Sequence, residues 1–346
     1  MQGQHYFGAM YVKRNIRASI ILSFAWRNLI KFTVWSTIVV VSFIYLKTID
    51  INIGIPFLPI STIGIAVAFY VGFKNSQSYD RFWEGRKIWG GIVNYSRTWA
   101  NQVLSFVSNL HAEVKLGENE LKEVHRSLIY RHIAWVNALR IQLRKTTIHD
   151  RHNLSYVPDF KLANDRDCTN HVSTFLDAGE YADIISKANG ATHINKNQGQ
   201  ALKELRESGL IDEFRHMRMM DTLEEFYNLQ GMCERIKNTP FPRQYAYFSS
   251  LFVWIFVVLL PFGLVEEFEK IADGSIIWLT IPFSVLISWI FTTIEIVGDN
   301  SEDPFENYVN DVPMTAISRT IEIDLREMLG ETELPPKVEP VGDILL

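Results

Sequence analysis

The feature that most constrains this chain is a run of about 23 residues without a charge, from Ile51 to Phe73 between Asp50 and Lys74. A helix of that length crosses the roughly 30 Å hydrocarbon core of a bilayer. Lys31 and Lys47 shorten the charge-free run at Leu29–Leu46, but lysines at the ends of a span can extend to the headgroups. The other predicted spans are Leu29–Leu46, Gln244–Val265 and Gly274–Ile294. The sequence therefore predicts an all-α polytopic membrane protein with four transmembrane helices per subunit.

Basic residues gather on one side of these spans. They precede the first span, follow the second and precede the third: Lys13, Arg14, Arg17, Arg27 and Lys31; Lys74, Arg81, Arg86 and Lys87; Arg235, Lys237 and Arg243. The two short loops between paired spans are poor in basic residues by comparison. Because basic residues remain on the cytoplasmic side, we expect both termini and the long hydrophilic insert to face the cytoplasm. We expect a multi-pass protein of the inner (plasma) membrane, without a secretory signal.

The order of the spans predicts four parts along the chain. Residues 1–73 hold an N-terminal amphipathic helix and the first two spans, 74–243 a helical cytosolic domain, 244–298 the last two spans, and 299–346 a cytosolic helix and tail. In the insert, helical periodicity predicts helices at Thr174–Lys187 and Gln198–Arg235, and polar composition predicts a loop at Thr146–Ala163. A final helix is expected at Thr315–Leu329, with an extended tail from Glu333.

The composition excludes several classes of function. The chain is 47% hydrophobic with a net charge of −5, and it has no basic block of the kind that binds nucleic acid. The two cysteines, Cys168 and Cys233, are too far apart for a metal or redox motif. His149 and His152 form a pair without a third ligand, which is more typical of a surface than of a zinc site. No nucleotide-binding, metalloprotease or hydrolase motif occurs. We therefore expect no enzyme activity, no cofactor and no bound metal.

Two stripes run along the second span at helical spacing. Gly64, Ala68 and Gly72 form a ridge of small residues, which permits close helix packing in lipid. The next position round the helix carries the bulky stripe Ile65, Phe69 and Phe73. Such a stripe can form a narrow hydrophobic constriction of an ion pore. Residues at this spacing more often face lipid or a neighbouring helix, so the spacing alone leaves both interpretations open.

Three motifs resemble the bestrophin family, specifically its bacterial branch. The first is Phe73-Lys74-Asn75 followed by YDRFWEGRKIWG at 79–90, the second is CERIKNTPFP at 233–242, and the third is EDPFENYVNDVP at 302–313. They stand in the family's order and span most of the chain. Aromatic residues and paired charges in the 79–90 segment are also typical of a membrane-interface anchor, so we expect a structural role there.

The resemblance implies a ring-shaped homopentamer that forms an ion channel. The family's neck is lined by the second transmembrane helix, and its three neck positions match Ile65, Phe69 and Phe73. The family also has a lower cytosolic aperture formed by a short apolar residue, for which Ile194 is the candidate. Closed ring symmetry needs an interface between different surfaces of neighbouring subunits. The Gly64, Ala68 and Gly72 ridge could supply it between second helices. The expected partners are further copies of this chain, the lipid bilayer and permeating ions.

The sequence contains opposing indications of whether the channel selects anions or cations. Ring edges of Phe69 and Phe73 carry partial positive charge and favour anions, whereas the acidic loop residues Glu266, Glu267 and Glu269 would concentrate cations. Bacterial relatives with an aliphatic middle neck residue are associated with cation passage, and this chain has Phe69 there. We predict passage of small monovalent anions such as chloride. The alternatives are a cation channel of the same architecture and a non-conducting membrane-anchored scaffold or sensor.

Two groups of acidic residues are candidates for cation binding. Animal bestrophins chelate calcium with a run of acidic residues after a Pro-Phe-Gly element, and this chain has only Glu306 and Asp311 after Pro304-Phe305. A calcium ion needs about six to eight oxygen ligands, so we expect no calcium activation. Glu295 and Asp299 end the fourth span, either as a cation site or as a solvated helix end. We favour the solvated helix end.

Overall fold

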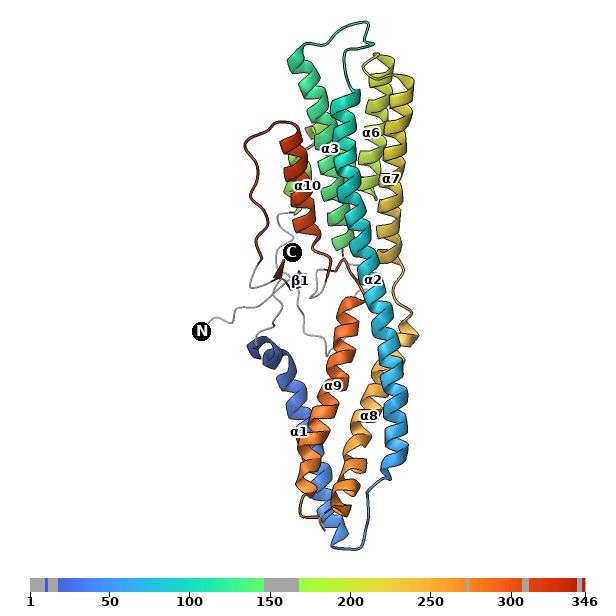
Figure 1. Ribbon diagram of the computed structural model, residues 1–346, viewed down its shortest axis with the longest axis vertical. Coiled ribbons are helices and arrows are strands. Elements are labelled where there is room, and N and C mark those ends of the chain that lie inside the picture. Colours follow the sequence, from blue (N-terminus) through green and yellow to red (C-terminus); the bar gives the residue numbers. More distant parts are fainter. Residues whose placement is uncertain are drawn as a thin grey trace.

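The structure is a computed structural model that describes residues 10–11, 18–145, 168–271, 274–306, 311–340 and 344–345. The loop expected at Thr146–Ala163 and the pair His149 and His152 lie outside the described residues. Figure 1 shows an elongated molecule made of two helical bundles joined end to end. A two-residue antiparallel pairing joins β1 (Met10–Tyr11), near the start of the chain, to β2 (Ile344–Leu345), near its end.

Four apolar helices form the lower bundle in Figure 1, and all four are long and apolar enough to cross a membrane. They are α1 (Ala18–Lys47), α2 (Phe57–Phe106), α8 (Arg243–Lys270) and α9 (Thr280–Ser301), with the short 3₁₀ turn η3 (Ile277–Leu279) before α9. The helix α2 packs against α8 and α9, and α1 packs mainly against α9. The four predicted spans are therefore confirmed as helices.

The second span begins later than the sequence predicts. The charge-free run starts at Ile51, but its first six residues form no helix and α2 begins at Phe57. Pro56 stands directly before the helix with φ −48° and ψ 132°, the extended conformation that a proline readily adopts. The helix then continues without a break to Phe106, for 50 residues or about 75 Å. The expected domain boundary at 73/74 thus falls inside one continuous helix.

The upper bundle packs around the C-terminal half of α2. Its helices are α3 (Glu118–Arg144), α4 (Cys168–Thr174), α5 (Ala178–Ile185), α6 (Gly190–Glu207), α7 (Glu213–Asn238) and α10 (Met314–Met328). Large aromatic side chains fill its centre, where Trp89, Trp99, Trp135 and Phe226 are completely buried. The C-terminal helix expected at Thr315–Leu329 is confirmed by α10.

Two helices predicted in the insert have different bounds in the structure, and one of them is two helices. The predicted Gln198–Arg235 helix is interrupted between α6 and α7, where Gly209 has a left-handed φ of 75°. A Cβ on Gly209 would lie 2.5 Å from the carbonyl oxygen of His111, so this close turn requires glycine. Asp212 then caps α7 by accepting a hydrogen bond from the Arg215 amide at 2.9 Å. The helix predicted at Thr174–Lys187 is confirmed but shorter, because α4 ends at Thr174 and α5 spans Ala178–Ile185.

Candidate functional site

The exposed face of α2 carries the three residues that match the family's neck. The exposed fractions of Ile65, Phe69 and Phe73 are 73%, 78% and 50%. The opposite face of the same helix is buried against α8 and α9 through Ile60, Val67 and Val71. The chain's own helices therefore cover α2 on one side only. The bulky stripe is turned away from the rest of the chain.

The small-residue ridge does not form one surface. Gly64 is buried against α8, because a Cβ there would lie 2.8 Å from Cε2 of Phe256. Ala68 and Gly72 are exposed, and no atom lies within 4 Å of where a Cβ on Gly72 would stand. The prediction of a ridge between neighbouring subunits is therefore wrong for Gly64, whose lack of a side chain accommodates Phe256. Ala68 and Gly72 stay predictions for a contact between subunits.

A buried charged cluster lies directly behind the neck stripe. The ammonium group of Lys74 contacts Glu295 Oε1 at 2.8 Å and also pairs with Asp299. All three side chains are buried, and the Ser249 hydroxyl donates to Glu295 Oε2 at 2.7 Å. The solvated helix end that we favoured for Glu295 and Asp299 is therefore wrong. Both carboxylates are instead held by the lysine that follows Phe73.

The sequence did contain a signal for this cluster. Glu295 and Asp299 are four residues apart, on one face of the fourth span, and Lys74 ends the second span. The predicted topology places both span ends on the cytoplasmic side, where opposite charges at equal depth can pair. Because carboxylates at a helix end are usually solvated, the pairing could not be preferred before the contact between α2 and α9 was known.

A second contact between α2 and α9 depends on a glycine. The Asn75 amide Nδ2 donates to the carbonyl oxygen of Ile294 at 3.0 Å. A Cβ on Gly298 would lie 1.8 Å from Asn75 Oδ1, which no packing tolerates without movement. Asn75 therefore fills the space that Gly298 leaves open, so that the two helices approach closely at this level.

The three family-like motifs meet in space at the junction of the two bundles. The Arg81 guanidinium donates to the Glu302 carbonyl oxygen at 2.9 Å and to the Ile236 carbonyl oxygen at 3.1 Å. Phe305 packs over Gly85, where a Cβ would lie 3.2 Å from Phe305 Cζ. One arginine thus connects the first motif with both of the others. This contact gives a physical reason for three motifs that lie far apart in the sequence.

The aromatic residues of the first motif divide between two environments. Tyr79 and Trp83 are 57% and 48% exposed and their rings stack, with centroids 6.5 Å apart. Trp89 is completely buried among the helices of the upper bundle. A membrane-interface anchor is therefore wrong for Trp89, whose ring belongs to the core.

Ile194 is completely buried on the inner face of α6. A residue that lines an aperture must present its side chain to the conduit, so the prediction of Ile194 as the lower aperture is wrong. The THINKNQG segment forms the start of α6, and the periodicity of that helix turns Ile194 into the core. Ile185, at the end of α5, is an aliphatic residue of the same region that is exposed, at 63%.

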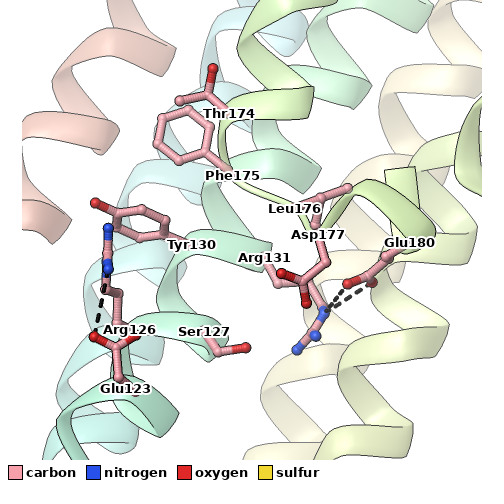
Figure 2. Close-up of a pocket in the computed structure, with 10 residues that line it drawn as sticks. All are labelled: Glu123, Arg126, Ser127, Tyr130, Arg131, Thr174, Phe175, Leu176, Asp177 and Glu180. Atoms are coloured by element: carbon pink, nitrogen blue, oxygen red, sulfur yellow. Dashed lines mark hydrogen bonds and ion pairs between the residues drawn. The ribbon is translucent and has the colours of Figure 1, made fainter. Parts of the chain in front are cut away.

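A polar pocket of about 240 Å³ lies between α3 and the segment formed by α4 and α5. Figure 2 shows Arg126 beside Glu123 at one side and Arg131 beside Glu180 at the other. The guanidinium to carboxylate distances are 3.6 Å and 3.0 Å. Both arginines in this pocket are therefore paired with acidic side chains of the same pocket, and it offers no concentration of one charge to a ligand.

Glu266, Glu267 and Glu269, expected in a loop, lie instead at the end of α8, at the other end of the membrane bundle, and they are largely paired. Lys270 lies 3.2 Å from Glu266 and 3.0 Å from Glu267, and Lys47 pairs with Glu269. These pairs reduce the negative field that we expected at the outer mouth. Within the described residues, no group of three or more His, Cys, Asp or Glu side chains could hold a metal ion.

Comparisons with known proteins agree on one family. A family model described as "Bacterial/Fungal Bestrophin protein" matches residues 4–327. The voltage-dependent anion channel-forming protein YneE of Escherichia coli O157:H7 is 30% identical over 291 residues, which cover 84% of this chain and 83% of that protein. A voltage-dependent anion channel-forming protein of Ralstonia nicotianae is 27% identical over 303 residues, which cover 88% and 87% of the two chains.

A solved structure supports the same assignment. A bacterial bestrophin homologue from Klebsiella pneumoniae superposes with a TM-score of 0.72 at 29% sequence identity, covering 88% of this chain and 98% of that one. The family-model match over residues 4–327 includes both helical bundles and all three motifs. The chain therefore belongs to the bacterial and fungal bestrophin family.

Proposed function

We propose that the chain forms a homopentameric channel for small monovalent anions such as chloride, with a hydrophobic neck lined by Ile65, Phe69 and Phe73. The observation that carries this proposal is the exposed bulky stripe on a span whose other side is covered by α8 and α9. An apolar constriction controls conduction by controlling whether water fills it. Two curated relatives are named as anion channel-forming proteins, which favours anions.

A ring of subunits follows from the shape of one chain. Each subunit leaves one face of α2 uncovered by its own helices, and four helices packed as a bundle do not enclose a conduit. Closed rotational symmetry would bring the α2 face of every subunit to a common axis. The number five rests on the family resemblance. In this arrangement the helical domain of residues 74–243 surrounds a cytosolic vestibule, and both termini face the cytoplasm at the inner membrane.

Anion preference has two physical supports in this chain. Phe69 and Phe73 can turn their positive ring edges toward the axis, where a partly dehydrated anion is stabilised. The acidic residues at the end of α8, which would favour cations, are paired with Lys270 and Lys47. The neck thus acts on the ion at the narrowest point, while the opposing field at the mouth is weak.

The conductance of Phe69→Ala tests this function against the scaffold alternative. Removing a ring of five phenyl groups widens and wets a hydrophobic neck, so conductance in a planar bilayer should rise several-fold. Phe283→Ala is the matched control, because Phe283 is a 46% exposed aromatic residue on α9 and lies outside the proposed neck. Equal conductance of both variants and the unaltered protein would contradict the neck assignment. A monomer as the stable species in detergent would contradict the ring.

A further inference from the structure

The exposed stripe on α2 does not end at the neck. The helix is continuous from Phe57 to Phe106, and each residue turns it by about 100°. Nine positions beyond Phe73 on the cytosolic side fall within about 40° of the direction of Phe69. Eight of them are exposed: Ser76, Asp80, Trp83, Lys87, Asn94, Thr98, Asn101 and Ser105. Gly91 is the exception, because the Leu229 side chain lies beside it. The upper bundle thus leaves the same face of α2 uncovered as the membrane bundle does.

Most charged residues elsewhere on this part of α2 are engaged with the chain itself. Arg81 donates to backbone carbonyl oxygens, Glu84 lies 2.6 Å from Arg235, and Arg97 lies 2.6 Å from Asp324. Asp80 and Lys87 differ from them, because neither has an ion pair or a side-chain hydrogen bond to any residue that the structure describes. Arg86 has no ion pair or side-chain hydrogen bond to a described residue either, but it lies about 100° round the helix from the direction of Phe69. Asp80 and Lys87 are the charged residues among the eight exposed positions on this face.

We propose that Asp80 and Lys87 form two charged rings on the cytosolic permeation path and set the anion selectivity there. The inference rests on the proposed function, because the rings exist only if the α2 faces meet at an axis. At about 1.5 Å per residue, the Asp80 carboxylates lie roughly 10 Å beyond Phe73 and the Lys87 ammonium groups roughly 20 Å beyond it. The Asp80 ring opposes anion entry into the neck, and the Lys87 ring concentrates anions in the vestibule.

Ionic screening determines how strongly each ring acts on an ion in the neck. The Debye length is about 10 Å at 0.1 M salt and about 3 Å at 1 M. At 0.1 M the Asp80 ring therefore acts directly on an ion in the neck, whereas the Lys87 ring acts mainly on the vestibule. Both effects should fall strongly at 1 M.

The test is the reversal potential of the assembled channel under a KCl gradient near 0.1 M, for Asp80→Asn and Lys87→Gln. Asp80→Asn should raise the chloride to potassium permeability ratio by at least about twofold, and Lys87→Gln should lower it. Both shifts should shrink near 1 M salt. Asp80→Glu keeps the charge and should restore the original ratio, which separates a charge effect from a folding defect.

Matched controls lie on the same helix. Glu84→Gln and Arg97→Gln remove charges that are paired within the chain, so they should leave the permeability ratio unchanged. If Asp80→Asn and Lys87→Gln also leave it unchanged while Phe69→Ala raises conductance, this inference fails and the proposed neck stands. If neither the unaltered protein nor Phe69→Ala carries current, the proposed function fails and the charged rings fail with it.

Discussion

Nζ of Lys74 lies 2.8 Å from Oε1 of Glu295, and the two side chains are only 1% and 5% exposed. This ion pair joins α2 to α9 one residue after Phe73. A charge removed from water is tolerated only with a partner, and breaking such a pair is costly. The pair therefore fixes the rotation and depth of the neck helix relative to the fourth span.

Replacing Lys74 should destabilise the fold strongly. Lys74→Met leaves Glu295 and Asp299 buried without their cation, at a cost of about 3–5 kcal/mol. Thermal unfolding of the detergent-solubilised protein should show a clearly lower midpoint. Lys122→Met is the control, because Lys122 is exposed and pairs with exposed Glu118 at 2.6 Å, so its midpoint should not change. Equal midpoints for both variants would mean that the cluster is solvated.

Gly298 and Asn75 should behave as a coupled pair. Gly298→Ala places a methyl group where Asn75 Oδ1 now lies, so Asn75 must move and the contact between α2 and α9 must loosen. We expect a destabilisation of about 1–3 kcal/mol, the range typical of overpacking. Asn75→Ala combined with Gly298→Ala should recover most of this loss, as measured by a double-mutant cycle. Additive losses would contradict the contact.

His132 should make the fold acid-sensitive. Burial among Trp99, Trp135 and Phe226 lowers the pKa of His132 to about 3 from its ordinary 6.5. Between these values the unfolded chain binds a proton that the folded chain does not, so stability falls as the pH falls below 6.5. The slope is about 1.4 kcal/mol per pH unit.

A neutral residue at position 132 isolates the contribution of His132 protonation to the loss of stability at low pH. His132→Asn retains a polar partner for Ser96, whose hydroxyl lies 2.8 Å from His132 Nε2, but it cannot gain a proton. Urea unfolding should show that the unaltered protein loses stability between pH 7 and pH 5.5. The variant should lose about 1.4 kcal/mol less over the same change of pH. The same loss in both proteins would assign the acid sensitivity to other groups.

Cys233 should be unreactive in the folded protein. Its side chain is completely buried, and burial raises the pKa of the thiol well above its ordinary value. Because the thiolate is the reactive form, a maleimide reagent should label Cys233 only after denaturation. The measurement uses Cys168→Ser, so that a single thiol remains. Rapid labelling of the native variant would contradict this burial.

Much of the membrane part could be predicted from the sequence because its rules are simple. Charge-free runs marked all four spans, and spacing by four placed Ile65, Phe69 and Phe73 on one face of α2. The ends of the helices were harder to predict from the sequence, because no charged residue marks where the extended segment ends and α2 begins at Phe57. In the upper bundle, Gly209 interrupts an otherwise helical pattern, and only its close approach to His111 shows why.

The candidate site required contacts between distant segments. Gly64 and Gly72 look alike in the sequence, yet Phe256 occupies the space beside the first and no atom stands beside the second. Ile194 satisfied the chemistry of an aperture residue, but the helix that carries it turns it inward. Glu295 and Asp299 have the composition of a solvated helix end, and only the packing of α9 on α2 pairs them with Lys74.

The reversal potential of the purified channel in a planar bilayer under a KCl gradient tests the central claim most directly. If Ile65, Phe69 and Phe73 line an anion path, the reversal potential lies close to the chloride equilibrium potential. The current then increases in Phe69→Ala and stays unchanged in Phe283→Ala. A reversal potential close to the potassium equilibrium potential would contradict anion selectivity. The absence of current in both the unaltered protein and Phe69→Ala would contradict the channel itself.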